Sequence, residues 1–198
     1  SSAITTLDEC VYGLNDAKMQ IMQMIGLWLT NPNAVGNAIA IKGPPGTGKT
    51  TLIKDGISKI LKRYFALIPL GGNSDASDLI GHCSTYEGAK HGDIIDIIIR
   101  GRSMNPCILF DELDKLSETA KGNEIKGVLT HLTDSSQNDK FHDKYFSGID
   151  FDLSKALFIF SLNNEKLINP ILKDRITVIN MKGFKIDEKI NIIKDYLL

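Results

Sequence analysis

Cysteine is scarce in this 198-residue sequence, and the few cysteines form no recognisable pattern. Cys10, Cys83 and Cys107 are odd in number, lie far apart and include no CxxC pair. This excludes a disulfide framework or a cysteine-rich zinc site as the organising feature of the fold. So few cysteines, unpaired, are typical of a reducing intracellular compartment.

Long apolar runs are also missing. No run approaches the roughly 18 residues that a membrane-spanning helix needs. Residues 1–8 lack the basic and then apolar layout of a signal peptide. We therefore expect a soluble protein without a membrane partner, located in the cytoplasm. The composition is equally compatible with an organellar matrix.

An excess of charge of one sign is absent as well. Lys and Arg total 23 against 24 Asp and Glu, which gives a net charge of −1. The overall charge therefore provides no electrostatic argument for nucleic-acid binding, which the sequence leaves open. What is present is an ordinary globular composition, with 42% hydrophobic and 24% charged residues. The length suffices for one α/β core, or for one core and the start of a second lobe.

Short apolar runs alternate with segments of helical periodicity along the chain. The apolar runs predict buried strands at 38–42, 64–70, 107–110, 156–160 and 176–181. The helical spacing predicts helices at 15–30, 51–63, 124–132 and 187–198. The run 94–99 reads as a helix, although its β-branched residues also suit a strand. The alternation predicts an α/β fold, with a five-stranded parallel sheet covered by helices on both faces.

A glycine-rich turn follows the first predicted strand. Gly43 to Thr50 fits G-x-x-x-x-G-K-[ST] without a mismatch and opens a predicted helix, which is the setting that phosphate binding requires. Lys49 would reach the β- and γ-phosphates of ATP, and the Thr50 hydroxyl would join the shell of a Mg²⁺ ion. The alternative is a turn with no chemical role. The residues expected to contact ATP or ADP here are Pro45, Gly46, Thr47, Gly48, Lys49, Thr50 and Thr51.

Two acids end the third predicted strand. Asp111 and Glu112 follow an apolar run, and ligands of a parallel sheet bind at the carboxyl ends of its strands. Asp111 is expected to hold Mg²⁺ beside Thr50, and Glu112 to act as the general base toward water. The alternative is an exposed acidic turn that caps the next helix.

Polar residues near the last two strands are further candidates. Asn163 follows the fourth strand, where an amide can orient the attacking water, although an Asn-Asn pair also suits a plain turn. Arg175 precedes the fifth strand. In a ring it would reach a neighbour's nucleotide and stabilise the transition state. The alternative is a surface arginine paired with Asp174.

With these motifs in order, the chain resembles the AAA+ P-loop ATPase module of the Lon protease family. The resemblance runs from about Leu7 to the C-terminus. It rests on Asp8 to Leu14, Gly71-Gly72, Gly81-His82, Thr85 to Ala89, Asn105-Pro106, Asp111 to Lys115, Asp152 to Lys155, Asn163 and Asp174-Arg175. It implies an N-terminal linker and helix at 1–36, a large nucleotide-binding subdomain at 37–182 and the start of a small helical lid at 183–198.

The same resemblance implies a function in protein quality control. ATP hydrolysis in a homo-oligomeric ring, usually a hexamer, would unfold protein substrates and thread them into a protease chamber. By position, Tyr86 and Glu87 belong to the substrate-gripping pore loop, Asn163 is the sensor asparagine and Arg175 is the arginine finger. The residues that would border the adenine are Tyr12, Gly13, Leu14, Phe184 and Ile192.

The chain departs from the family pattern in the pore loop and near its end. Glu87 replaces an aliphatic residue, and Cys83 and Ser84 replace two basic ones, so the grip on substrate is expected to be weaker or tuned differently. Tyr86 packing on its own domain is the alternative there. The family's second sensor arginine and Ser–Lys protease dyad have no counterpart within these 198 residues.

Three functions compete. The first is the ATPase module of a Lon-type protease. The second is a stand-alone AAA+ remodeller or DNA-associated ATPase without proteolysis. The third is a nucleotide-gated assembly module that barely hydrolyses ATP, against which Glu112 argues because such a module needs no base. The stretch from Thr85 to Ala89 favours the first over the second.

Overall fold

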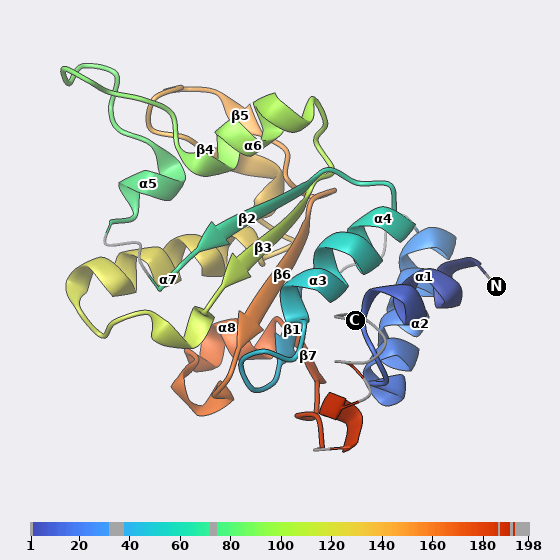
Figure 1. Ribbon diagram of the computed structural model, residues 1–198. Coiled ribbons are helices and arrows are strands. Elements are labelled where there is room, and N and C mark those ends of the chain that lie inside the picture. Colours follow the sequence, from blue (N-terminus) through green and yellow to red (C-terminus); the bar gives the residue numbers. More distant parts are fainter. Residues whose placement is uncertain (1, 32–37, 72–74, 186, 191, 193–198) are drawn as a thin grey trace.

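The computed structural model describes residues 2–31, 38–71, 75–185, 187–190 and 192 (Figure 1). Within these ranges no helix is long and apolar enough to cross a membrane. Parts of two expectations lie outside the described residues: Gly72, and residues 191 and 193–198 of the predicted last helix. Residues 187–190 and 192 of that last helix are helical, as predicted.

A five-stranded parallel sheet forms the centre of the molecule, and this confirms the predicted fold class. Its order is β2-β3-β6-β1-β7. The strands are β1 (Ala38–Lys42), β2 (Phe65–Pro69), β3 (Cys107–Asp111), β6 (Leu157–Leu162) and β7 (Thr177–Asn180). The register aligns Lys42 of β1 with Leu162 of β6, and Phe110 of β3 with Phe160 of β6. The carboxyl ends of β1, β3 and β6 therefore meet at one edge of the sheet.

Alternation along the strands divides the core into two apolar layers. Ile39 and Ile159 face one layer, while Ala40 and Phe160 face the other. The first layer is covered by α1 (Ser2–Cys10), α2 (Asn15–Thr30) and the helix formed by α3 (Lys49–Thr51), the π-helical η1 (Leu52–Ile57) and α4 (Ser58–Ile60). The second is covered by α5 (Ser77–Ile80), α6 (Asp93–Gly101), α7 (Ala120–Leu132) and α8 (Pro170–Asp174).

The structure decides one open question about secondary structure and contains elements that the sequence did not predict. The β-branched run 94–99 is helical, within α6, because Ile94, Ile95 and Ile97 share one buried face at helical spacing. The helix α1 was not predicted, since among the residues 3–10 whose burial is described only Leu7 is a buried core residue. A small antiparallel hairpin of β4 (Phe141–His142) and β5 (Asp150–Phe151) was also not predicted, because two-residue strands carry no periodic signal. The remaining elements are the 3-10 turns η2 (Leu113–Lys115), η3 (Asn138–Lys140) and η4 (Glu165–Leu167).

Candidate functional site at the carboxyl edge of the sheet

The loop between β1 and α3 has a backbone that depends on its glycines. Gly46 and Gly48 have φ angles of 76° and 80°, in the left-handed region that other residues rarely adopt. A Cβ on Gly43 would lie 2.7 Å from the Met181 carbonyl oxygen, so this position also requires glycine. The loop thus follows the end of β1 closely and delivers the chain to the helix that begins at Lys49.

Lys49 is held over this loop. Its Nζ donates to the carbonyl oxygens of Gly43 (2.6 Å) and Pro44 (3.0 Å) and to Oδ1 of Asn163 (3.1 Å). Partial burial lowers the pKa of Lys49, while the carboxylates of Asp111 and Asp114 act in the opposite direction. The result is a cation whose partners are neutral oxygens, poised to exchange them for the charged oxygens of a phosphate.

The two acids at the end of β3 are fixed by a neighbouring strand. The Ser161 hydroxyl, on β6, donates to Asp111 and accepts from the backbone N–H of Glu112 at 3.0 Å. Glu112 itself adopts a left-handed backbone with φ of 60°, which is costly for a residue with a side chain. Its carboxylate lies against Gly71, where an added Cβ would collide with it.

A cavity of about 320 Å³ brings the predicted phosphate loop together with Asp111, Glu112 and Asn163. It is lined by Pro45, Gly46, Thr47, Gly48, Lys49, Thr50, Thr51, Asp111, Glu112, Asp114, Ser161, Leu162 and Asn163. Three of these, Asp114, Ser161 and Leu162, were missed as site residues. Ser161 carried a usable signal, because it is the only polar residue of the fully buried strand β6.

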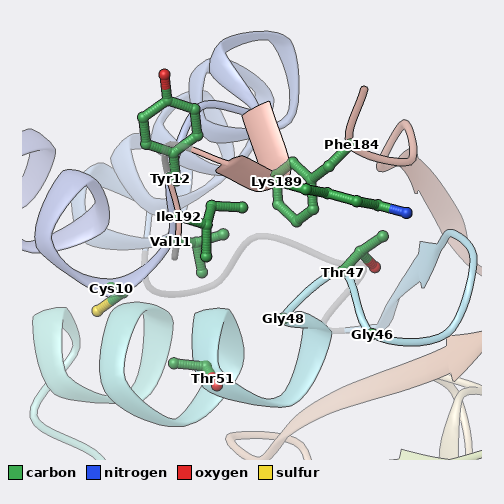
Figure 2. A pocket seen from close by; sticks show the side chains of 10 residues that line it. All are labelled: Cys10, Val11, Tyr12, Gly46, Thr47, Gly48, Thr51, Phe184, Lys189 and Ile192. Atoms are coloured by element: carbon green, nitrogen blue, oxygen red, sulfur yellow. The ribbon is translucent and has the colours of Figure 1, made fainter. Parts of the chain in front are cut away.

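A second cavity, of about 430 Å³, adjoins the first and shares Gly46, Thr47, Gly48 and Thr51 with it (Figure 2). Its other lining residues are Cys10, Val11, Tyr12, Phe184, Lys189 and Ile192. Apolar and aromatic walls beside a phosphate cavity suit a planar nucleobase. Figure 2 shows the Tyr12 hydroxyl pointing away from the phosphate loop. Gly13 and Leu14 instead line a separate cavity of about 310 Å³, which also includes Phe184.

Arg175 lies outside these cavities. It follows α8, and its Nη1 donates to the Thr130 carbonyl oxygen at 2.6 Å while its Nη2 lies 3.2 Å from Asp134 Oδ2. The suggested pairing with Asp174 is therefore wrong, and Asp134 is the acidic partner. The Arg175 side chain remains 31% exposed.

Tyr86 lies in the loop between α5 and α6, which projects from the upper left in Figure 1. The residue is 70% exposed, which argues against the alternative in which it packs on its own domain. Its neighbour Glu87 is exposed too. Neither residue lines the nucleotide cavities.

The parallel sheet, the glycine loop and the acids at the same edge define a P-loop nucleotide-binding ATPase. The sequence profile of the ATPase family associated with various cellular activities (AAA) matches residues 39–184. The chain therefore belongs to the AAA family of ATPases.

Its relatives show which branch of that family it is similar to. It is 41% identical over 193 residues to a Lon protease homolog of Acanthamoeba polyphaga mimivirus, covering 97% of this chain and 19% of that protein. It is 39% identical over 192 residues to the mitochondrial Lon protease homolog 3 of Arabidopsis thaliana, covering 97% and 20%. It is 41% identical over 192 residues to Lon protease 1 of Bacillus subtilis, covering 97% and 24%. The resemblance inferred from the motifs is confirmed, and the chain spans about a fifth to a quarter of the length of these relatives.

Proposed function

We propose that this chain is the motor of a Lon-like ATP-dependent protease, in which Mg²⁺-dependent ATP hydrolysis drives protein unfolding and translocation. The observation that carries the catalytic part is the meeting of Lys49, Asp111, Glu112 and Asn163 in one cavity. These residues come from three separate parts of the sequence and lie together only because β1, β3 and β6 end at the same edge. Residues 37–182 would then form the nucleotide-binding subdomain.

The donor set fits Mg²⁺. Asp111 and Thr50 line the phosphate cavity, and Mg²⁺ in such sites takes few protein ligands beside waters and phosphate oxygens. Among the described residues, no group of three or more His, Cys, Asp or Glu side chains is arranged to hold a metal ion by itself. When bound, the ion would neutralise charge on the β- and γ-phosphates.

The phosphate loop, Lys49, Glu112 and Asn163 have separate tasks in hydrolysis. Lys49 leaves its loop carbonyls and binds phosphate oxygens, while the loop N–H groups and the helix N-terminus hold the β-phosphate. Glu112 accepts a proton as the water oxygen bonds to the γ-phosphorus and the bond from that phosphorus to the ADP oxygen breaks. The Asn163 amide orients the water. Tyr12, Phe184 and Ile192 would enclose the adenine.

Two residues outside the nucleotide cavities, the half-buried Arg175 and the exposed Tyr86, support assembly and a protein substrate. Arg175 stands outside its own cavity with a partly exposed side chain, as an arginine that serves a neighbouring subunit of a ring would. Tyr86 presents an aromatic ring on a projecting loop, which suits contact with an unfolded chain. We therefore propose a homo-oligomeric ring, hexameric as in the family pattern, with Tyr86 and Glu87 facing the threaded polypeptide.

The experiment that tests the catalytic assignment compares Glu112→Gln with Glu124→Gln. The amide at position 112 keeps the shape of the side chain and removes the base, so ATP should bind normally while hydrolysis stops. Glu124 is an exposed acid on α7, and its variant should hydrolyse ATP at the unmodified rate. Hydrolysis near the unmodified rate in Glu112→Gln would refute the assignment of the base.

A further inference from the structure

Asp114 is a buried acid at the edge of the phosphate cavity. It lies in the turn η2, two residues beyond Glu112, and is 9% exposed. It lines the cavity together with Lys49 and Asn163. The scheme of hydrolysis above gives this carboxylate no task, and burying a carboxylate requires compensating contacts.

The contacts of Asp114 are directed at the turn that follows β6. Its Oδ2 accepts hydrogen bonds from the backbone N–H groups of Asn163 (3.2 Å) and Asn164 (3.0 Å). The side chain of Asn163 in turn accepts a hydrogen bond from Lys49. One carboxylate oxygen therefore fixes the backbone from which the Asn163 amide reaches the phosphate loop.

The other oxygen of the Asp114 carboxylate, Oδ1, is buried and accepts no hydrogen bond from the described residues. An unpaired buried oxygen destabilises the fold, so general stability does not account for an acid at this position. An apolar residue of similar size could not make the two hydrogen bonds from Oδ2 to the turn after β6.

We propose that Asp114 is a positioning residue for ATP hydrolysis. It holds the turn between β6 and η4 so that the Asn163 amide stays beside Lys49, where the γ-phosphate would lie. It acts through the backbone of Asn163. This inference rests on the proposed function, because that function gives Asn163 the task of orienting water.

The first test needs neither nucleotide nor activity. In the nucleotide-free protein, amide hydrogen exchange at Asn163 and Asn164 is compared between Asp114→Ala, Asp114→Asn and the unmodified chain. Removal of the acceptor should speed exchange at both amides about tenfold or more, since their bonds then open freely. The asparagine variant keeps a carbonyl acceptor and should keep the protection. The Glu112 amide, bonded to Ser161, is the internal control and should not change.

The second test is kinetic. Asp114→Ala should lower kcat by about 10²-fold with KM nearly unchanged, the loss expected when an oriented polar group leaves its place. Asn163→Ala should show the same loss, and the double variant should be no slower than either single one, because both changes remove one function. Asp114→Asn should restore kcat to within about threefold of the unmodified protein, since its amide oxygen still accepts both bonds.

The outcomes separate this inference from the proposed function. If Asp114→Asn is as inactive as Asp114→Ala, or if the two losses multiply, the positioning role is wrong. The role is equally wrong if the exchange of Asn163 and Asn164 does not change in Asp114→Ala. Should Asp114→Ala fail to fold, Asp114→Asn alone decides, by keeping or losing kcat and amide protection. Hydrolysis by Glu112→Gln would overturn the base assignment, while the exchange result on Asp114 would still stand.

Discussion

At the scale of single residues, Lys49 and the two acids were predictable because each belongs to a short motif whose spacing carries the chemistry. Ser161 and Asp114 were not, because their tasks arise from contacts across the sheet. Ser161 links Asp111 to the Glu112 backbone, and Asp114 links η2 to the end of β6. Residues about 50 positions apart in sequence thus meet in one hydrogen-bond network, and no local sequence pattern predicts such contacts.

The loss of Lys49 should strongly weaken ATP binding. Its Nζ is the main side-chain counter-charge to the phosphates, so Lys49→Ala should weaken affinity by about 100-fold or more, the worth of two charge-assisted hydrogen bonds. Lys54→Ala, which removes an exposed lysine further along the same helix, should bind ATP normally. Isothermal titration calorimetry measures both. Micromolar affinity retained in Lys49→Ala would contradict the phosphate-loop assignment.

The three thiols should differ in their reaction with iodoacetamide. Burial raises the pKa of Cys10, so its thiolate forms and reacts only as the pH rises well above neutrality. A hydrogen bond with Thr85 lowers the pKa of Cys83, which should react at lower pH. Burial raises the pKa of Cys107 to about 11, and this buried thiol should stay unmodified in the folded protein.

Nucleotide should change that pattern at one position only. Cys10 lines the cavity proposed for the adenine, so saturating ATP should slow its alkylation, while Cys83, on the distant projecting loop, should react as before. Mass spectrometry of labelled peptides gives both rates. Equal rates at Cys10 with and without ATP would place the adenine elsewhere.

At the scale of elements, the predicted strands and the longer helices are confirmed because burial on one or both faces imposes a period on the sequence. The projecting loop 81–92 is different, since it has no periodic pattern and a buried acid from outside it holds its end at Gly92. Asp143 accepts from the Gly92 N–H at 2.8 Å and from the Tyr145 N–H at 2.9 Å, which fastens the loop to the hairpin of β4 and β5. The hairpin was not predicted because each of its strands has only two residues. Such short strands form few hydrogen bonds with each other, so the bonds of Asp143 help to hold the hairpin.

Asp143→Ala should therefore destabilise the protein. It leaves the buried Gly92 N–H without an acceptor and removes the acceptor of the partly buried Tyr145 N–H, which costs about 1–3 kcal/mol in the free energy of unfolding. Asp139→Ala, at an exposed position of η3, should change that free energy by less than about 0.5 kcal/mol. Urea denaturation followed by circular dichroism compares them. Equal midpoints for the two variants would show that Asp143 does not hold the loop.

At the scale of the whole molecule, the strand order β2-β3-β6-β1-β7 assembles the site. It inserts β6 between β1 and β3, so Asn163 lies between the phosphate loop and the acids. The sequence predicted five parallel strands but not this order, because the order depends on crossovers that local periodicity does not encode. Side-chain contacts between distant elements could not be predicted either. The position of Arg175 before the last strand was predicted, but its contacts with Thr130 and Asp134 result from the packing of α8 on α7.

The central claim is that each complete site joins Glu112 of one subunit to Arg175 of the next. Arg175→Ala and Glu112→Gln should each bind ATP normally and lose hydrolysis, by about 10³-fold or more for the arginine. Asp134→Asn is the matched control, because it weakens the ion pair and leaves the guanidinium in place. It should remain active if Arg175 works across subunits rather than through Asp134.

The most direct measurement mixes the two inactive proteins and records ATP hydrolysis after mass measurement has verified mixed assemblies. Where a subunit with intact Glu112 adjoins one with intact Arg175, a complete site is restored, so the mixture should recover part of the activity that neither variant has alone. The recovery should rise to a maximum at intermediate mixing ratios. Mixed assemblies without any recovery would show that Glu112 and Arg175 do not complete one site across subunits, and would contradict the account.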